Sequence, residues 1–271
     1  GLPLDPFAGP DLKGWRSQLR RHRPSLVFLT TNFHNPTGYS YSSAELGQIL
    51  DLSQEFGFGI LEDDWGSEML SFSQFKPSLR ARGGDQVFYV NSFTKKLLPS
   101  LRLGYLAGNA LTAPLLAQIK TLSCLGLSPI IEAVLFEFLD RGYYDAHLKV
   151  LQAELDERYR SCLEALRQTM PEEVKWTTPG GGPGVWVEVP KRVDLNRLQA
   201  RMAGKGYLLW TMDDWFLGHP HLNGFRLGYA LLPPGVMRTG IEVLAQMLRQ
   251  ELACGPAFAR NKGVEYVLKA E

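Results

Sequence analysis

The chain has 271 residues, of which 45% are hydrophobic and 21% charged, so it can form one large or two modest domains with a sizeable core. Its 29 Lys and Arg residues nearly balance 28 Asp and Glu residues, and the net charge of +1 argues against broad binding to a nucleic-acid backbone. Three widely spaced cysteines offer neither a disulfide framework nor a zinc spacing, and no long apolar run is present. We expect a cytoplasmic protein without a membrane span.

The first half of the chain predicts strands alternating with helices. Residues 11–23 form a basic segment compatible with a helix, whose charge we interpret as a solvated face rather than a nucleic-acid patch. Residues 26–31 predict a buried strand, and Ser42 and Glu45 have the spacing of a capping box ahead of a helix that Gly57 ends. Residues 58–61 and 87–90 predict two more strands, and right-handed crossovers would make all three parallel.

The second half predicts a smaller α/β domain. Helices are expected over residues 111–123, 129–139, 146–169, 194–203 and 233–253, and strands over 185–189, 207–210 and 225–231. The helix over 146–169 is long enough to join the two halves. We therefore divide the chain into a large domain over residues 1–140 and, over residues 141–271, a linking helix with a C-terminal small domain.

Chemically active side chains follow the three predicted parallel strands. Asn35 and Asp63 each come just after a strand, and Lys95 follows the strand over residues 87–90, with Arg102 seven residues later. Since ligands bind at the carboxyl ends of strands in open α/β sheets, we expect these groups to converge. Loss of water and a nearby cation would lower the pKa of Lys95 and leave an amine that attacks carbonyls. With the Ser92 hydroxyl and an arginine fork beside it, a phosphorylated aldehyde would suit the site.

Four motifs occur in order along this half of the chain: NFHNPTG, EDDW, SFTKK and LRLGY. Together they resemble the fold-type I, class I/II aminotransferases, which use pyridoxal 5′-phosphate (PLP). The chain is most similar to the aminotransferase-like domains of MocR regulators, which carry a GntR-type winged helix, because Ser67 and Glu68 follow EDDW and LLPSLRLGYLAG follows the lysine. The resemblance implies an incomplete α/β large domain, with a mostly parallel sheet and flanking helices, plus a smaller C-terminal α/β domain.

The resemblance also implies a role for each residue at the strand ends. Lys95 would bind PLP as an imine and move a proton during catalysis. Asp63 would pair with the pyridine nitrogen, which keeps the ring an electron sink. Asn35 would bind the ring oxygen, and Ser92 and Arg102 would hold the phosphate.

Other matched positions concern the substrate and its surroundings. Arg226 would grip the α-carboxylate of a substrate, with Asn35 also at the substrate side. Trp65 stands where many members have a tyrosine whose hydroxyl bonds the cofactor; an indole has only an N–H donor. Asp64 is expected to be structural and Lys96 to point elsewhere. Structural roles stay as alternatives for the site residues themselves: a surface charge for Lys95, a loop cap for Asp63, and ion pairs for Arg102 and Arg226. We predict no metal site, although His219 and His221 flank a proline.

Members of the family begin with a segment that supplies a helix N-terminus to the cofactor phosphate and an aromatic side chain that stacks on the ring. This chain begins after that segment, so we expect an N-terminally truncated fragment, with open sheet edges that favour a homodimer. Two functions stay open, with PLP as the cofactor and an amino acid or amine as the ligand. We favour an effector-sensing domain that reaches DNA only through a domain absent from this chain. The other is a catalytic aminotransferase. A cofactor-free scaffold is a third possibility.

Overall fold

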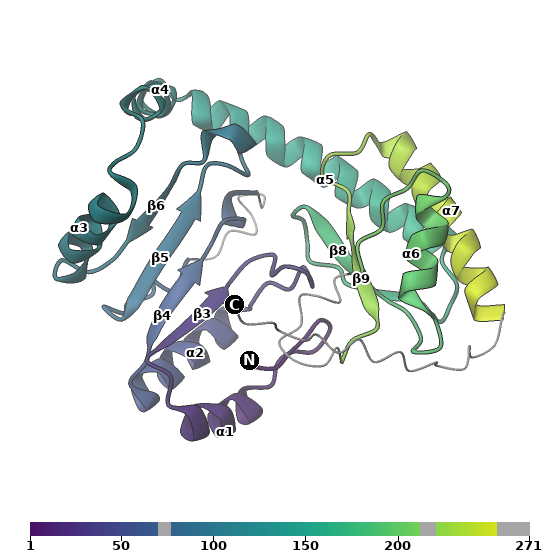
Figure 1. Cartoon of the computed structure of the whole chain (residues 1–271), viewed down its shortest axis with the longest axis horizontal. Coiled ribbons are helices and arrows are strands. Elements are labelled where there is room, and N and C mark those ends of the chain that lie inside the picture. The colour runs from purple at the N-terminus through teal and green to yellow at the C-terminus, as the bar shows by residue number, and fades with distance from the viewer. Residues whose placement is uncertain (70–76, 212–220, 254–271) are drawn as a thin grey trace, which may run out of the picture.

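A four-stranded sheet organises the first half of the chain. The computed structural model describes residues 1–69, 77–211 and 221–253 (Figure 1). In this sheet, strands β3 (Leu26–Thr30), β4 (Gly59–Asp63) and β5 (Val87–Ser92) run parallel, and β6 (Gly104–Ala107) pairs antiparallel with β5. The predicted α/β class and mostly parallel sheet are confirmed. A short hairpin of β1 (Leu4–Asp5) and β2 (Gly9–Pro10) precedes it.

Two helices cover one face of this sheet. They are α1 (Leu12–His22) and α2 (Ser43–Phe56), whose apolar side chains pack with those of the first three strands into one core. The predicted capping box is present, since Ser42 accepts from the backbone of Glu45 and the Glu45 side chain accepts from the backbone of Ser42. Gly57 ends α2 with φ of 71°, a left-handed conformation that glycine adopts without strain.

The opposite face of the sheet is open. Side chains alternate along β3, so that Val27 and Leu29 are buried against the helices while Phe28, on the other side, is 60% exposed. The strand over residues 26–31 was predicted to be buried, and this prediction is wrong for the face that carries Phe28. In the described part of the chain no helix packs over Phe28, and this open face forms a wall of the cavity described below.

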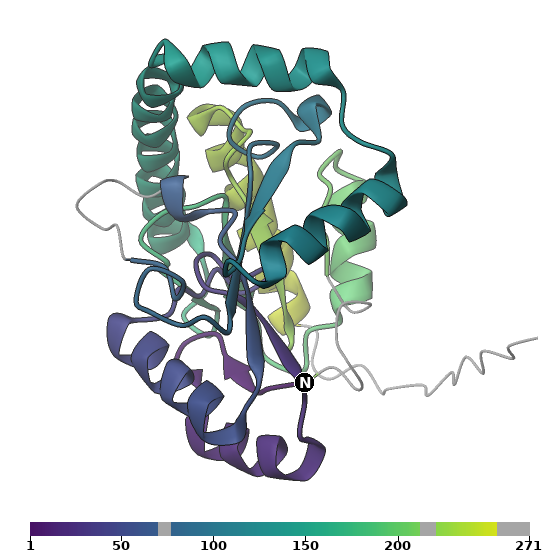
Figure 2. The same cartoon turned by 90° about the vertical axis from the view of Figure 1, so that its left-hand side faces the viewer.

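Helices α3 (Thr112–Cys124) and α4 (Pro129–Asp140) extend from the far edge of the sheet (Figure 2). Both are rich in apolar residues, yet α3 contains no buried residue and α4 only Leu135. Leu122 and Ile130 are among their exposed side chains. These two helices therefore carry an apolar surface that nothing in the described part of the chain covers.

The 27-residue helix α5 (Tyr143–Thr169) runs from the first sheet to the second (Figure 1). Its C-terminal half packs with a C-terminal unit made of strands β7 (Lys175–Trp176), β8 (Gly184–Glu188) and β9 (Gly224–Gly228) and helices α6 (Leu195–Ala203) and α7 (Pro234–Ala253). The three strands form an antiparallel sheet in the order β7-β8-β9. This confirms the smaller C-terminal α/β part, with Asp194 capping α6 as predicted.

One predicted strand is absent. Residues 207–210 lie outside any ladder of the described residues: Leu209 enters the core and Tyr207 packs against it, while Leu208 is 91% and Trp210 59% exposed. The predicted strand over 225–231 also ends earlier, at Gly228.

Some predictions stay untested. The division at residue 140 stays a prediction, although α5 begins at Tyr143, and so does the cytoplasmic location. His219 and the tail from Gly255 lie outside the described residues. Within the described ranges, no helix is both long and apolar enough to cross a membrane.

Candidate functional site

The residues predicted from the strand ends meet in one cavity of about 1830 Å³, between the open face of the four-stranded sheet and the C-terminal unit. This volume exceeds the roughly 300–1,000 Å³ typical of small-molecule sites, so the cavity is a wide cleft that could take more than one small ligand. All seven candidate site residues line it: Asn35, Asp63, Trp65, Ser92, Lys95, Arg102 and Arg226.

Strand alternation explains why Asp63 and Ser92 share this cleft. Asp63 pairs with Val90 across β4 and β5, and Ser92 lies two residues further along β5, on the same side of the sheet. The neighbouring Glu62 points to the covered side, where it is fully buried and accepts hydrogen bonds from the backbone N–H groups of Leu79 and Arg80. The consecutive carboxylates of Glu62 and Asp63 thus lie on opposite faces of the sheet, with Asp63 in the cavity and Glu62 in the core.

Asp63 offers a partly buried carboxylate to the cavity. Burial raises its pKa, the backbone N–H of Trp65 donates to it and acts in the opposite direction, and the neighbouring Asp64 raises the pKa further. No lysine, arginine or histidine in the described part of the chain forms an ion pair with it. A positive charge on a ligand would therefore be stabilised beside Asp63.

Asn35 lies on a turn that touches the C-terminal unit. Gly38 in this turn has φ of 72°, and a Cβ atom there would lie 3.3 Å from the backbone oxygen of Gly184. The hydroxyl of Thr177 donates to the carbonyl of Thr37 at 3.1 Å. The turn that presents Asn35 is therefore attached to the second sheet, on the other side of the cleft.

Lys95 is exposed on the turn after β5, so the expected loss of water around it is not found. Two further groups lie on the same stretch: the hydroxyl of Ser92 accepts from the backbone of Thr94 at 3.2 Å, and Arg102 follows a 3₁₀ turn with φ of 49°. Neither Lys95 nor Arg102 pairs with a carboxylate among the described residues, which leaves both cations available to a ligand.

Arg226 projects from β9 on the opposite side of the cleft. Burial lowers the pKa of its guanidinium, and no carboxylate of the described residues pairs with it. Gly184 on the adjacent strand makes room for this group, since a Cβ atom there would lie 3.1 Å from Nε of Arg226. The structural ion pair that we kept as an alternative is thus not found within the described ranges.

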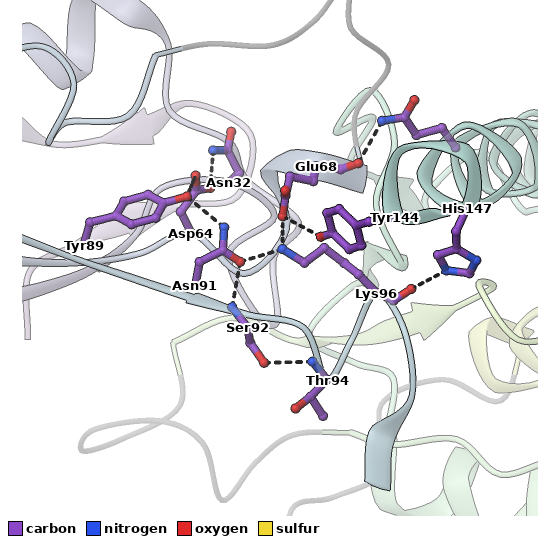
Figure 3. Close-up of polar contacts among 11 residues, drawn as sticks. Asn32, Asp64, Glu68, Tyr89, Asn91, Ser92, Thr94, Lys96, Tyr144 and His147 are labelled. Carbon is purple, nitrogen blue, oxygen red and sulfur yellow. Dashed lines mark hydrogen bonds and ion pairs between the residues drawn. The ribbon is translucent and has the colours of Figure 1, made fainter. Parts of the chain in front are cut away.

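Asp64 and Lys96 do not line the cleft but belong to a polar network beside it, which reaches Ser92 because the backbone N–H of Ser92 donates to Asn91 Oδ1 (Figure 3). Asp64 accepts from Asn32 Nδ2 at 2.8 Å and from the Tyr89 hydroxyl at 3.0 Å, which confirms the structural role expected for it. Lys96 points away from the cleft, as predicted, and forms an ion pair with Glu68. Asn91 connects the contacts of Asp64 with those of Lys96, because its Nδ2 donates to the Tyr89 hydroxyl and its Oδ1 accepts from Lys96.

Comparison with known proteins gives the family. The family model for aminotransferases of class I and II matches residues 1–211. The chain belongs to this family. Aromatic-amino-acid aminotransferase 1 of Thermococcus litoralis is 27% identical over 84% of this chain and 55% of that protein. The uncharacterized HTH-type transcriptional regulator YisV of Bacillus subtilis is 28% identical over 92% of this chain and 51% of that protein.

Solved structures agree with the family. LysN, an α-aminoadipate aminotransferase from Thermus thermophilus complexed with N-(5′-phosphopyridoxyl)-L-leucine, matches with a TM-score of 0.86 and 29% identity, over 93% of this chain and 66% of LysN. The fold is that of the fold-type I aminotransferases, as predicted. The chain spans about half to two thirds of the length of these relatives, which include both enzymes and regulators.

The cofactor of this aminotransferase family is PLP, and the groups present fit it. PLP carries an aldehyde, a phosphate and a pyridine nitrogen. The cleft offers a lysine and an arginine without carboxylate partners among the described residues, together with a partly buried carboxylate that favours a cation.

Trp65 stands where the resemblance to the family implies a tyrosine in many members. Its ring packs against the apolar cluster of Phe33, Met69 and Leu155 at the wall of the cleft. Because an indole lacks a hydroxyl, it cannot make the bond that a tyrosine would make at this position.

Proposed function

We propose that this aminotransferase-type domain binds PLP in the cleft. Lys95 would hold the cofactor covalently, Ser92 and Arg102 would bind the phosphate, Asp63 would pair with the pyridine nitrogen, and Asn35 would donate to the ring oxygen. One observation carries this proposal. Lys95 and Arg102, which have no carboxylate partner in the described ranges, line the same cleft as Asp63, whose partly buried carboxylate favours a cation. When bound, PLP would supply an electron sink to the ligand's α-carbon.

We propose that the second ligand is an amino acid or amine, with Arg226 selecting an α-carboxylate where one is present. A half-buried guanidinium without a carboxylate partner is costly, and a bidentate carboxylate would offset that cost with two charge-assisted hydrogen bonds. The position of Arg226 across the cleft from Lys95 supports this pairing of roles.

For the intact protein we favour effector sensing in a GntR/MocR-type regulator, in which ligand-dependent closure of the cleft reaches a DNA-binding domain. The Trp65 substitution, Ser67 and Glu68 after EDDW, and the likeness to YisV support this choice. Catalytic amino transfer between an amino acid and a 2-oxo acid is the alternative, and the likeness to aminotransferases supports it. A regulator and an enzyme would share the binding step.

The binding step is tested by adding PLP and recording the visible absorption of the covalently held cofactor. We expect a band in the wild type that disappears in Lys95→Ala. Lys120→Ala is the matched control, because Lys120 also lines the cleft. Absence of the band from the wild type, or an equal band in Lys95→Ala, contradicts the proposal and favours a cofactor-free scaffold.

Sensing and catalysis are separated by adding L-amino acids to the PLP-loaded protein and a 2-oxo acid. A spectral change without sustained release of a new 2-oxo acid supports the sensor. Release over many turnovers, lost in Lys95→Ala, supports the enzyme.

We also propose that the chain pairs with a second copy. The open sheet and the exposed apolar residues of α3 and α4, which include Leu122 and Ile130, support this arrangement. Light scattering on the purified chain tests it, and a monomer at micromolar concentration contradicts it.

A further inference from the structure

Lys96 is a lysine whose side chain is fully buried, with an exposed fraction of 0%. A buried charge is costly unless it is paired and hydrogen-bonded, and Lys96 has both kinds of contact. Its Nζ forms an ion pair with Glu68 Oε2 and donates to Asn91 Oδ1 at 2.6 Å (Figure 3). It also lies 5.8 Å from the centre of the Phe93 ring. Burial lowers the pKa of Lys96 to about 8, so the amine is still mostly protonated at neutral pH.

Helix α5 holds both members of this ion pair. The Tyr144 hydroxyl donates to Glu68 Oε2 at 3.2 Å, and Gln152 Nε2 donates to the Glu68 carbonyl at 2.9 Å. His147 Nε2 donates to the carbonyl of Lys96 at 2.7 Å. These three side chains are spaced to lie along one side of the helix, and in Figure 3 Tyr144 lies beside the side chain of Lys96 and His147 beside its carbonyl.

The same helix also reaches the strand that carries Arg226. Leu163 and Leu166 of α5 belong to the core of the C-terminal unit. Arg158, between the two contact regions, donates to the carbonyl of Ala230, just past β9. One uninterrupted helix thus contacts the turn after β5 and the end of β9, on the two sides of the cleft.

The side chain of Lys95 forms neither a hydrogen bond nor an ion pair with any described residue, so its position depends on the turn around it. That turn is closed by backbone bonds from Lys96 and Leu97 to the carbonyl of Phe93, at 3.1 and 2.8 Å. Since Lys96 is drawn into the interior by Glu68 and Asn91, its neighbour Lys95 faces the cleft.

We propose that Lys96 and Glu68 are positioning residues that hold the Lys95 turn and attach it to α5. We call their network, with Asn91, Tyr144 and His147, the clasp. The clasp keeps Lys95 and Arg226 in a defined arrangement across the cleft, because α5 is common to both sides. For PLP this rests on the proposed function; the anchoring of the turn does not depend on PLP.

The test compares Lys96→Met, Glu68→Gln and the double variant with the wild-type chain. Hydrogen exchange of residues 93–103 is measured without ligand, PLP affinity by absorption titration, and stability by urea unfolding. Glu251→Gln is the control, because Glu251 is also buried and paired, with Arg197 and Arg201, but lies in the C-terminal unit.

We expect faster exchange in residues 93–103 and at the start of α5 in both single variants, with PLP affinity about tenfold or more weaker. The double variant should lose less PLP-binding free energy than the two single variants lose in sum, since both substitutions break the same interaction. Glu251→Gln should lose stability without either local effect. That separates positioning of Lys95 from a general loss of stability.

The proposal is overturned if the single variants exchange residues 93–103 at the wild-type rate and bind PLP within about twofold of the wild-type affinity. If Lys96→Met does not fold, Glu68→Gln decides, because glutamine retains an oxygen that accepts from Tyr144. If the wild type itself gives no Lys95-dependent band, the proposed function fails, and the exchange measurement still decides whether the clasp anchors the turn.

Discussion

Replacing Arg226 with methionine separates a ligand-binding arginine from a structural one. The methionine keeps much of the length of the side chain but removes a half-buried charge that has no carboxylate partner in the described ranges. Removing such a charge should leave folding stability unchanged or raise it by up to about 1 kcal/mol. Loss of charge-assisted hydrogen bonds to an α-carboxylate should cost at least about 2 kcal/mol, or roughly 30-fold in affinity.

The assay is a titration of the PLP-loaded protein with an L-amino acid and, in parallel, with the amine that lacks its carboxylate. Only the amino acid should bind more weakly to Arg226→Met. Arg197→Met is the matched control, because Arg197 pairs with the buried Glu251 and its loss should lower stability without changing ligand affinity. A large loss of stability in Arg226→Met with unchanged amino-acid affinity would refute our assignment.

Three further changes probe the surroundings of the site. In Gly184→Ala, the added Cβ would lie 2.8 Å from the Leu227 oxygen and 3.1 Å from Arg226 Nε, so we expect a loss of about 1–3 kcal/mol in urea unfolding and weaker amino-acid binding. Equal affinity would show that Arg226 does not depend on this gap. Ser42→Ala removes the cap of α2 and should cost about 1 kcal/mol of stability, with PLP binding unchanged. Finally, burial lowers the pKa of Lys96 from 10.5 to about 8, so between these values the unfolded chain binds more protons. The unfolding free energy of the wild type, relative to Lys96→Met, should therefore rise with pH from about 8 to 10.5, and a flat difference would contradict this.

Local rules predicted most of the elements and the convergence of the site. The Ser42 capping box, the Asp194 cap and the long apolar periodicity of α5 are features that neighbouring residues determine among themselves. Parallel strands bring their ends to one edge, and for that reason the order of the strands along the chain was enough to expect Asp63 and Lys95 near each other.

What could not be predicted depends on contacts between distant segments. The partner of Lys96 is Glu68, 28 residues away, and its other support comes from α5, about 50 residues further along. The exposure of Phe28 depends on which face of the sheet lacks a covering helix, and strand patterns do not show that. Alternation along β5 was the available signal that the side chains of Asn91 and Ser92 point to different faces of the sheet.

Helix α5 has a mechanical consequence that its contacts alone do not express. Its 27 residues include neither glycine nor proline, so it is a stiff rod of about 40 Å. Bending is easiest at its ends, at Gly142, with φ of 71°, and just before Pro171. A tilt of only about 5° at one end would move the other by about 3–4 Å, the size of a shift that opens or closes a hydrogen bond. The helix can therefore act as a lever, turning a small tilt at one end into a displacement of several ångströms at the other.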